Sequence, residues 1–189
     1  MPLKINFENI EQKCINAVET KDYNLLIKKV NKAKKIWLLG NGGLHYVASH
    51  MATDLSRLIH DKSIYSFDST GFITSNANDH GWDQLFVRWL ETIALTENPN
   101  ECLVIGMSCS GNSPNIIHAL HWAHEKYRTK QIPILKKEIE ELSFDCDYFH
   151  TVEVLCMMIF YEMIHRTDNK CPSIKGEKNR LKDSNLRKL

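Results

Sequence analysis

Short apolar runs and helical stripes of apolar residues alternate along this chain. Residues 36–39 (Ile-Trp-Leu-Leu) form a continuous apolar run that ends in glycines, and residues 102–106 form a second such run. Runs of this length are typical of strands buried on both faces of a parallel sheet. Apolar residues at helical spacing follow each run, over residues 44–59 and from Pro114 onward. The alternation predicts an α/β fold with a mostly parallel sheet.

The same patterns give the remaining elements and the boundaries. Residues 5–33 are predicted to be helical, and strands are predicted at 63–67 and 132–135. Further helices are expected after Asp79, with an apolar stripe over residues 82–93, and at 152–164. The apolar pattern stops after about His165. We therefore divide the chain into an N-terminal helical segment (1–33), one domain (34–168) and a C-terminal tail (169–189).

Composition narrows the class of protein. The chain has 189 residues, enough for one domain with a buried core, and 24 basic against 23 acidic residues. This balance argues against a nucleic-acid-binding protein. Residues 170–189 hold seven basic and two acidic residues, which predicts a solvated tail. No C-x-x-C pair, signal peptide or membrane-length apolar run is present, so we expect a reduced cytoplasmic protein without membrane contact.

Two turns between a predicted strand and the next helix carry candidate chemistry. They are Gly40-Asn41-Gly42-Gly43 and Ser108-Cys109-Ser110-Gly111-Asn112-Ser113. In parallel α/β sheets, ligands bind beyond the carboxyl ends of the strands. Main-chain N–H groups, serine hydroxyls and a helix N-terminus there favour an anion. For either turn alone, helix capping is the better explanation. Two such turns in one domain favour a phosphate site, with the serine loop as the cradle.

Other polar residues leave two interpretations open. His50 and Asp54 lie four residues apart, so they share a helix face. They could transfer a proton or hold a metal, or they could form a solvated pair with Arg57. Asp79 either caps a helix or faces the same cleft. Cys109 could be reactive beside a helix N-terminus, or contact a ligand only through its backbone.

Four segments together resemble the SIS (sugar isomerase) family, in particular its phosphoheptose isomerase branch. They are IWLLGNGG (36–43), H-x-x-x-D (50–54), NDHGWDQLF (78–86) and SCSGNSPN (108–115). The resemblance implies a flavodoxin-like, three-layer α/β/α fold and a homotetramer or dimer with sites at subunit interfaces. It also implies aldose–ketose isomerisation of sedoheptulose 7-phosphate or a similar sugar phosphate through an enediol. That activity belongs to heptose biosynthesis for lipopolysaccharide or capsule precursors.

The resemblance also implies roles for particular residues. The residues that match the phosphate loop are Ser108, Cys109, Ser110 and Ser113. The residues that match sugar-contacting segments are Asn41, Gly42, Gly43, Asn78 and Asp79. His50 matches a metal ligand, and Asp54 stands where the family has a glutamate that is both metal ligand and general base. We expect Asp54 to act as the base and Asp79 to position the sugar. Zinc is expected to bind weakly or not at all, and no nucleotide cofactor is expected.

The chain departs from the family pattern at several positions. Leu44 replaces a serine, and Asp54 is one methylene shorter than glutamate. With the last helix aligned on Glu153, Val152 and Phe160 replace a glutamine and an essential histidine. A glycine-bearing loop is replaced by residues 136–140. These departures leave an alternative open, namely an inactive homologue that binds a phosphosugar or a protein as a regulatory or scaffold subunit.

Overall fold

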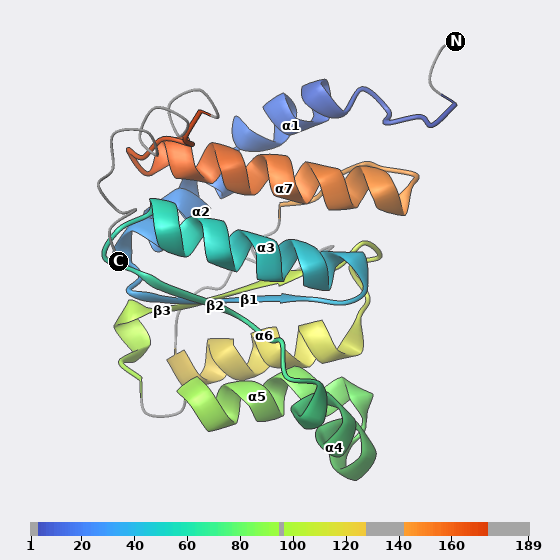
Figure 1. Ribbon diagram of the computed structural model, residues 1–189, viewed down its shortest axis with the longest axis vertical. Helices are drawn as coiled ribbons and strands as arrows, with labels where there is room; N and C mark the ends of the chain where they lie inside the picture. The colour runs from blue at the N-terminus through green and yellow to red at the C-terminus, as the bar shows by residue number, and fades with distance from the viewer. Residues whose placement is uncertain (1–3, 95–96, 128–141, 174–189) are drawn as a thin grey trace, which may run out of the picture.

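The computed structural model describes residues 4–94, 97–127 and 142–173, and these form a three-stranded parallel sheet between two layers of helices (Figure 1). The strands are β1 (Lys35–Gly40), β2 (Ser63–Ser66) and β3 (Cys102–Met107), in the order β2-β1-β3. The ladder between β1 and β3 continues to the pair Gly40–Met107. Because both strands end at the same edge, the turns that follow them emerge side by side. The predicted α/β fold with a parallel sheet is confirmed.

Alternating residues of β1 point into two separate cores. Ile36 and Leu38 pack with one layer of helices, whereas Trp37 and Leu39 pack with the other. The first layer contains α1 (Ile10–Val18), α2 (Lys21–Lys32), α3 (Gly43–Leu58) and α7 (Phe149–Arg166). The second contains α5 (Leu85–Ala94) and α6 (Pro114–Tyr127), with α4 (Thr70–His80) beside α5. Two short 3-10 helices, η1 (Trp82–Gln84) and η2 (Pro99–Glu101), precede α5 and β3.

The helices α3 and α7 lie side by side with their amino ends together (Figure 1). Glu153, in the first turns of α7, contacts Gly43 at the start of α3. Further along, Tyr161 of α7 is hydrogen-bonded to His50 and Asp54 of α3. Residues more than a hundred positions apart in the sequence therefore meet along one helix–helix contact.

The N-terminal segment was predicted as one helical stretch, and that prediction is wrong at its middle. The chain instead forms α1 and α2, which are separated at Glu19 and Thr20. The Thr20 hydroxyl accepts a hydrogen bond from Tyr23 N–H (3.1 Å) and caps the second helix. Tyr23 is fully buried, and its hydroxyl donates to the carbonyl of Ile159 in α7 (3.1 Å). Both helices thus belong to the core of the domain, and the boundary at residue 33 stays a prediction.

The helix α4 was not predicted from the sequence. None of the residues of this helix is buried, so it has no apolar stripe to mark it. It begins at a side-chain cap, because the hydroxyl of Ser69 accepts a hydrogen bond from Phe72 N–H (3.3 Å). Asn78 and Asp79 were predicted in a loop that opens a helix. They lie instead in the last turn of α4, so the N-cap interpretation of Asp79 is wrong.

Some predictions fall on residues that the structure does not describe. The strand at 132–135, the departure at 136–140 and most of the basic tail lie outside the described residues. None of the helices in the described ranges is long and apolar enough to cross a bilayer.

Candidate functional site

The turn after β1 forms one wall of the candidate site. Gly42 has a φ of 56°, a left-handed conformation that favours glycine, and α3 begins at the next residue. The N–H of Leu44 donates to the carbonyl of Asn41 (3.1 Å), and the N–H of His45 donates to that of Gly42 (3.1 Å). These bonds fold the turn tightly onto the first turn of α3, at the carboxyl end of β1.

The loop between β3 and α6 is braced by its own hydroxyls. The Oγ atoms of Ser108 and Ser113 lie 2.9 Å apart, and the N–H of Gly111 donates to Ser108 Oγ (3.1 Å). The N–H of Asn112 donates to the Oγ of Ser110 (3.2 Å). The N–H groups of Ser110 and Ser113 have no hydrogen-bond partner among the described residues. The loop therefore presents unpaired donors just before the N-terminus of α6, where an anion is favoured.

A pair of side-chain amides joins the two turns. The Asn41 amide donates to Asn115 Oδ1 (2.9 Å), and the Asn115 amide donates back to Asn41 Oδ1 (2.8 Å). Asn115 is fully buried in the first turn of α6, and its Oδ1 also accepts from the N–H of Ile116 (3.0 Å). Asn41 was predicted as a sugar contact, and this pairing gives its side chain a second role in holding the two loops together. Sequence reasoning missed Asn115 because its partner lies on another strand–helix turn.

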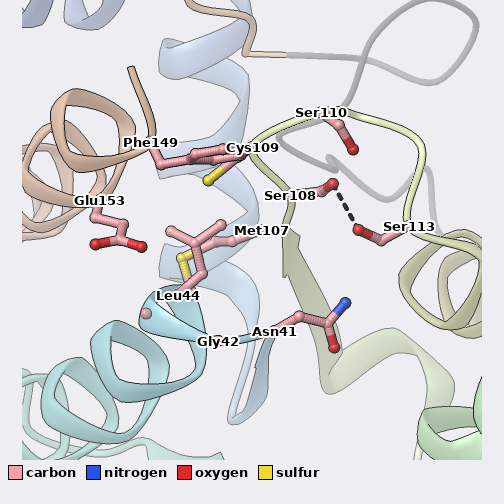
Figure 2. A pocket seen from close by; sticks show the side chains of 11 residues that line it. Asn41, Gly42, Leu44, Met107, Ser108, Cys109, Ser110, Ser113, Phe149 and Glu153 are labelled. Carbon is pink, nitrogen blue, oxygen red and sulfur yellow. Dashed lines mark hydrogen bonds between the residues drawn. The ribbon is translucent and has the colours of Figure 1, made fainter.

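Both turns line a single cavity of about 260 Å³ (Figure 2). The lining comes from the glycine turn, the end of β3, the serine loop and the start of α7: Asn41, Gly42, Gly43, Leu44, Met107, Ser108, Cys109, Ser110, Ser113, Phe149 and Glu153. The structure thus brings together all the predicted residues of the two loops. Leu44, at the position where the family has a serine, contributes an apolar side chain in place of a hydroxyl.

Glu153 is the one carboxylate among these lining residues, and no role was predicted for it from the sequence. Its carboxylate fills the space beside Gly43 where any other residue would place a Cβ. Even its farther oxygen would lie only 2.7 Å from such a Cβ. A helical pattern alone could not reveal this contact, since it depends on how α7 packs against α3. The lining contains no lysine or arginine among the described residues.

His50 and Asp54 lie elsewhere, further along α3, and neither lines the cavity. The hydroxyl of Tyr161 donates to Asp54 Oδ2 (3.0 Å), and its oxygen lies 3.0 Å from His50 Nε2, which donates to it. His50 Nε2 and Asp54 Oδ2 are 3.6 Å apart, and Arg57 also lies 3.6 Å from Asp54. Burial, followed by the hydrogen bond to Asp54, raises the pKa of Tyr161. The predicted metal-ligand pair is thus hydrogen-bonded to Tyr161, in a cluster where the His50 side chain is exposed.

This donor set does not fit a catalytic zinc ion. Such sites use three protein ligands, usually histidine, cysteine, aspartate or glutamate. Within the described residues, no three side chains of these types come together as a possible metal site. The hydroxyl of Tyr161 also engages both of the atoms, His50 Nε2 and Asp54 Oδ2, that a metal would need. No step of the reaction proposed below passes through a metal.

The positions that depart from the family pattern on α7 face the core. Val152 and Phe160 are 7% and 1% exposed, and both belong to the core between the sheet and the first helical layer. Neither residue lines the cavity. Asn78 and Asp79 also lie outside the cavity lining, at the end of α4, where the Asn78 amide donates to Asp79 Oδ1 (2.8 Å).

Cys109 lies in the cavity wall with its thiol partly buried. Burial raises the pKa of this thiol from 9.0 to about 11, and the nearby Glu153 carboxylate adds to the rise. The thiol is therefore protonated near neutral pH, and a protonated thiol is a poor nucleophile. Of the two interpretations left open by the sequence, a non-nucleophilic contact is the one that this environment favours.

Comparison with known proteins gives similarity in both sequence and structure. No known family model matches the chain. Phosphoheptose isomerases are similar in sequence, including one from Buchnera aphidicola subsp. Schizaphis graminum, with 37% identity over 123 residues. That alignment covers 63% of this chain and 57% of the relative. A second, from Syntrophotalea carbinolica, is 36% identical over 109 residues, or 55% of this chain and 53% of the relative.

The solved structures agree in fold. The phosphoheptose isomerase of Neisseria gonorrhoeae superposes with a TM-score of 0.71, covering 86% of this chain and 92% of that one at 19% identity. The enzyme from Francisella tularensis gives 0.67, with coverage of 86% and 94% at 18% identity. In sequence and in fold, the chain resembles the phosphoheptose isomerases. The resemblance inferred from the motifs is confirmed, although the chain spans little more than half the length of the curated phosphoheptose isomerases it matches.

Proposed function

We propose that this chain is a sugar-phosphate isomerase that binds the phosphate of its substrate on the loop 108–113. The observation that carries the proposal is the convergence of the glycine turn and the serine loop on one cavity. The relatives named phosphoheptose isomerase point to a heptose phosphate, and sedoheptulose 7-phosphate is the ketose we propose.

Phosphate binding in this cavity rests on local dipoles. The described lining has no basic side chain, so the attraction comes from the free N–H groups of Ser110 and Ser113, the hydroxyls and the N-terminus of α6. Serine hydroxyls can rotate to donate to phosphate oxygens. The Asn41–Asn115 pair keeps this cradle fixed to the glycine turn. Binding of an anion here therefore requires little rearrangement of the protein.

The proposed reaction is a proton transfer between neighbouring carbons. A base removes a proton from C1 of the ketose, and the C1–H electron pair forms the C1=C2 bond of an enediol while the carbonyl oxygen O2 takes up a proton. Return of the proton to C2 and loss of the proton from O1 then give the aldose. Substrate and product are isomers, so no oxidant or reductant is consumed. The protein must supply a base and donors for the developing oxyanion.

A second candidate is a homologue that binds the phosphosugar without turning it over. The specific observation in its favour is the burial of Phe160 at the position where the family pattern has a histidine. The serine loop has the same arrangement under both functions, so only turnover separates them. Weak or absent binding of zinc, a homotetramer or dimer, and a cytoplasmic location stay predictions of the sequence.

Turnover of sedoheptulose 7-phosphate by the full chain, followed by NMR as aldose formation, tests the proposal. The double variant Ser110→Ala, Ser113→Ala should raise KM by roughly tenfold to a hundredfold, because hydrogen bonds to a charged group are lost. Ser63→Ala, an exposed serine at the opposite end of the sheet, is the matched control and should leave KM unchanged. Binding without turnover would favour the second candidate. Absence of both binding and turnover would overturn the proposal.

A further inference from the structure

We infer that Glu153 is the base that removes the proton from the sugar, in place of Asp54. The inference rests on the proposed function and assigns a residue that the family pattern did not. Glu153 is the one carboxylate among the described residues that line the cavity. Asp54 lies outside the lining, and its Oδ2 accepts the hydrogen bond of Tyr161.

The carboxylate of Glu153 is positioned by its packing against Gly43 and by the N-terminus of α3. It occupies the space that the missing side chain of Gly43 leaves open, against the main chain of the first residue of α3. The positive end of the helix dipole favours a negative charge at that point. Glu153 forms no hydrogen bond or ion pair with the described residues. Its oxygens are therefore positioned by packing and remain available to a ligand.

The position of Glu153 relative to the serine loop suits an extended sugar phosphate. Figure 2 shows Glu153 on one side of the pocket and Ser108, Ser110 and Ser113 on the other, with Leu44 and Met107 between them. A heptose 7-phosphate carries its phosphate and its carbonyl at opposite ends of the carbon chain. With the phosphate on the serine loop, the chain can run past the apolar wall so that C1 approaches Glu153. This arrangement also separates the carboxylate from the phosphate, which carries the same sign of charge.

Apolar side chains line the cavity next to the Glu153 carboxylate, which is the proposed base. They are those of Leu44, Met107 and Phe149. In the proposed step, a Glu153 oxygen takes the proton from C1 of the ketose, the carboxyl proton exchanges with solvent, and the carboxyl group then delivers a proton to C2. The protein returns to its starting state with Glu153 ionised.

Three variants of the full chain test the assignment. Glu153→Gln keeps the size of the side chain but removes the base, so kcat should fall roughly 10²- to 10⁴-fold while KM changes by less than about threefold. Glu153→Asp keeps a carboxylate and should retain more activity than Glu153→Gln. Glu162→Gln is the matched control, because Glu162 lies on the same helix and pairs with Arg166 (2.7 Å) away from the cavity. It should keep wild-type kcat.

A second readout follows the proton itself. In D₂O, wild-type protein should exchange the C1 proton of sedoheptulose 7-phosphate for deuterium, and Glu153→Gln should lose this exchange while still binding the sugar. If Glu153→Gln kept the turnover and the exchange of the wild-type protein, the assignment of Glu153 would be overturned, but the isomerase function would not. A larger loss of kcat in Asp54→Asn than in Glu153→Gln would do the same. Absence of turnover and exchange in the wild-type chain would instead overturn the proposed isomerase function, and the assignment with it.

Discussion

At their amino ends, α3 and α7 bring Gly43 and Glu153 together beside an open cavity, whereas further along the same helices His50, Asp54 and Tyr161 bond to one another. Both regions contain a carboxylate and lie on the same helix–helix contact. In the first, the carboxylate is positioned by packing and its oxygens are free. In the second, a tyrosine hydroxyl engages the carboxylate and the imidazole. Spacing along a helix predicted the second pair, but only the partners across the contact show which carboxylate is available for chemistry.

The largest expected effect comes from placing a histidine at position 160. Phe160 is 1% exposed in the core, so Phe160→His removes packed apolar surface and buries a polar ring. We expect a loss of about 3–5 kcal/mol in the free energy of unfolding, measured by urea denaturation, and no gain in activity.

Tyr161→His, one residue further, is the matched control because Tyr161 is only partly buried and its hydroxyl lies beside His50. It should cost about 1 kcal/mol. It should also give the pair His50 and Asp54 a third ligand, so that zinc raises its Tm. Wild-type stability of Phe160→His with increased turnover would show that the active region lies at this end of the two helices.

The next largest effect on stability is expected at the contact between Gly43 and Glu153, at the amino ends of α3 and α7. Gly43→Ala places a methyl group on the Glu153 carboxylate, and we expect it to lower the free energy of unfolding by about 1–3 kcal/mol. In the double variant Gly43→Ala, Glu153→Ala the overlap disappears, so most of that loss should be recovered. Urea denaturation of the two single variants and the double variant gives the coupling. Strictly additive effects would contradict the contact between Gly43 and Glu153.

The smallest effect is expected for Tyr161→Phe, which removes the hydroxyl that joins His50 and Asp54. It should lower the free energy of unfolding by about 0.5–1.5 kcal/mol and change kcat less than about twofold, since Tyr161 lies outside the cavity.

The effect of Tyr161 should also depend on pH. Its pKa is raised above 10.0 in the folded chain by burial and by the bond to Asp54, so the neutral phenol is the stabilised form. Its contribution is present below pH 10.0 and is lost as the pH rises through the raised value. The difference between wild type and Tyr161→Phe should therefore be largest near about pH 8 and shrink above about pH 10. An unchanged difference would contradict this role of the hydroxyl.

The elements with strong apolar patterns could be predicted from the sequence. The runs at 36–39 and 102–106 became β1 and β3, and the turns after them form the cavity, because parallel strands end at one edge. The surface helix α4 carries no apolar stripe, and its start depends on a single capping hydroxyl at Ser69. The break between α1 and α2 likewise depends on Thr20. Local apolar patterns therefore predicted the buried helices and strands, but not the helix boundaries that depend on a capping side chain.

The candidate site divides in the same way. The loop residues are adjacent in sequence to predicted strands, so their convergence followed from the fold class. The contacts of Glu153 with Gly43 and of Tyr161 with Asp54 join residues on two helices far apart in the chain. Nothing in the spacing of either helix specifies the rotation of one against the other. That rotation, set by the packing of residues such as Phe160, decides which polar side chain faces the cavity.

The paired amides of Asn41 and Asn115 make the residue allowed at one position depend on the residue at the other. Each side chain is donor and acceptor for the other, so replacing one leaves the buried amide of the other without its partner. A lineage could exchange this pair only by changing both positions within a short time, or through an intermediate with a displaced loop. Among relatives of this chain, residues 41 and 115 are therefore expected to vary together, and a mismatch between them would mark a chain whose loop 108–113 has taken another shape.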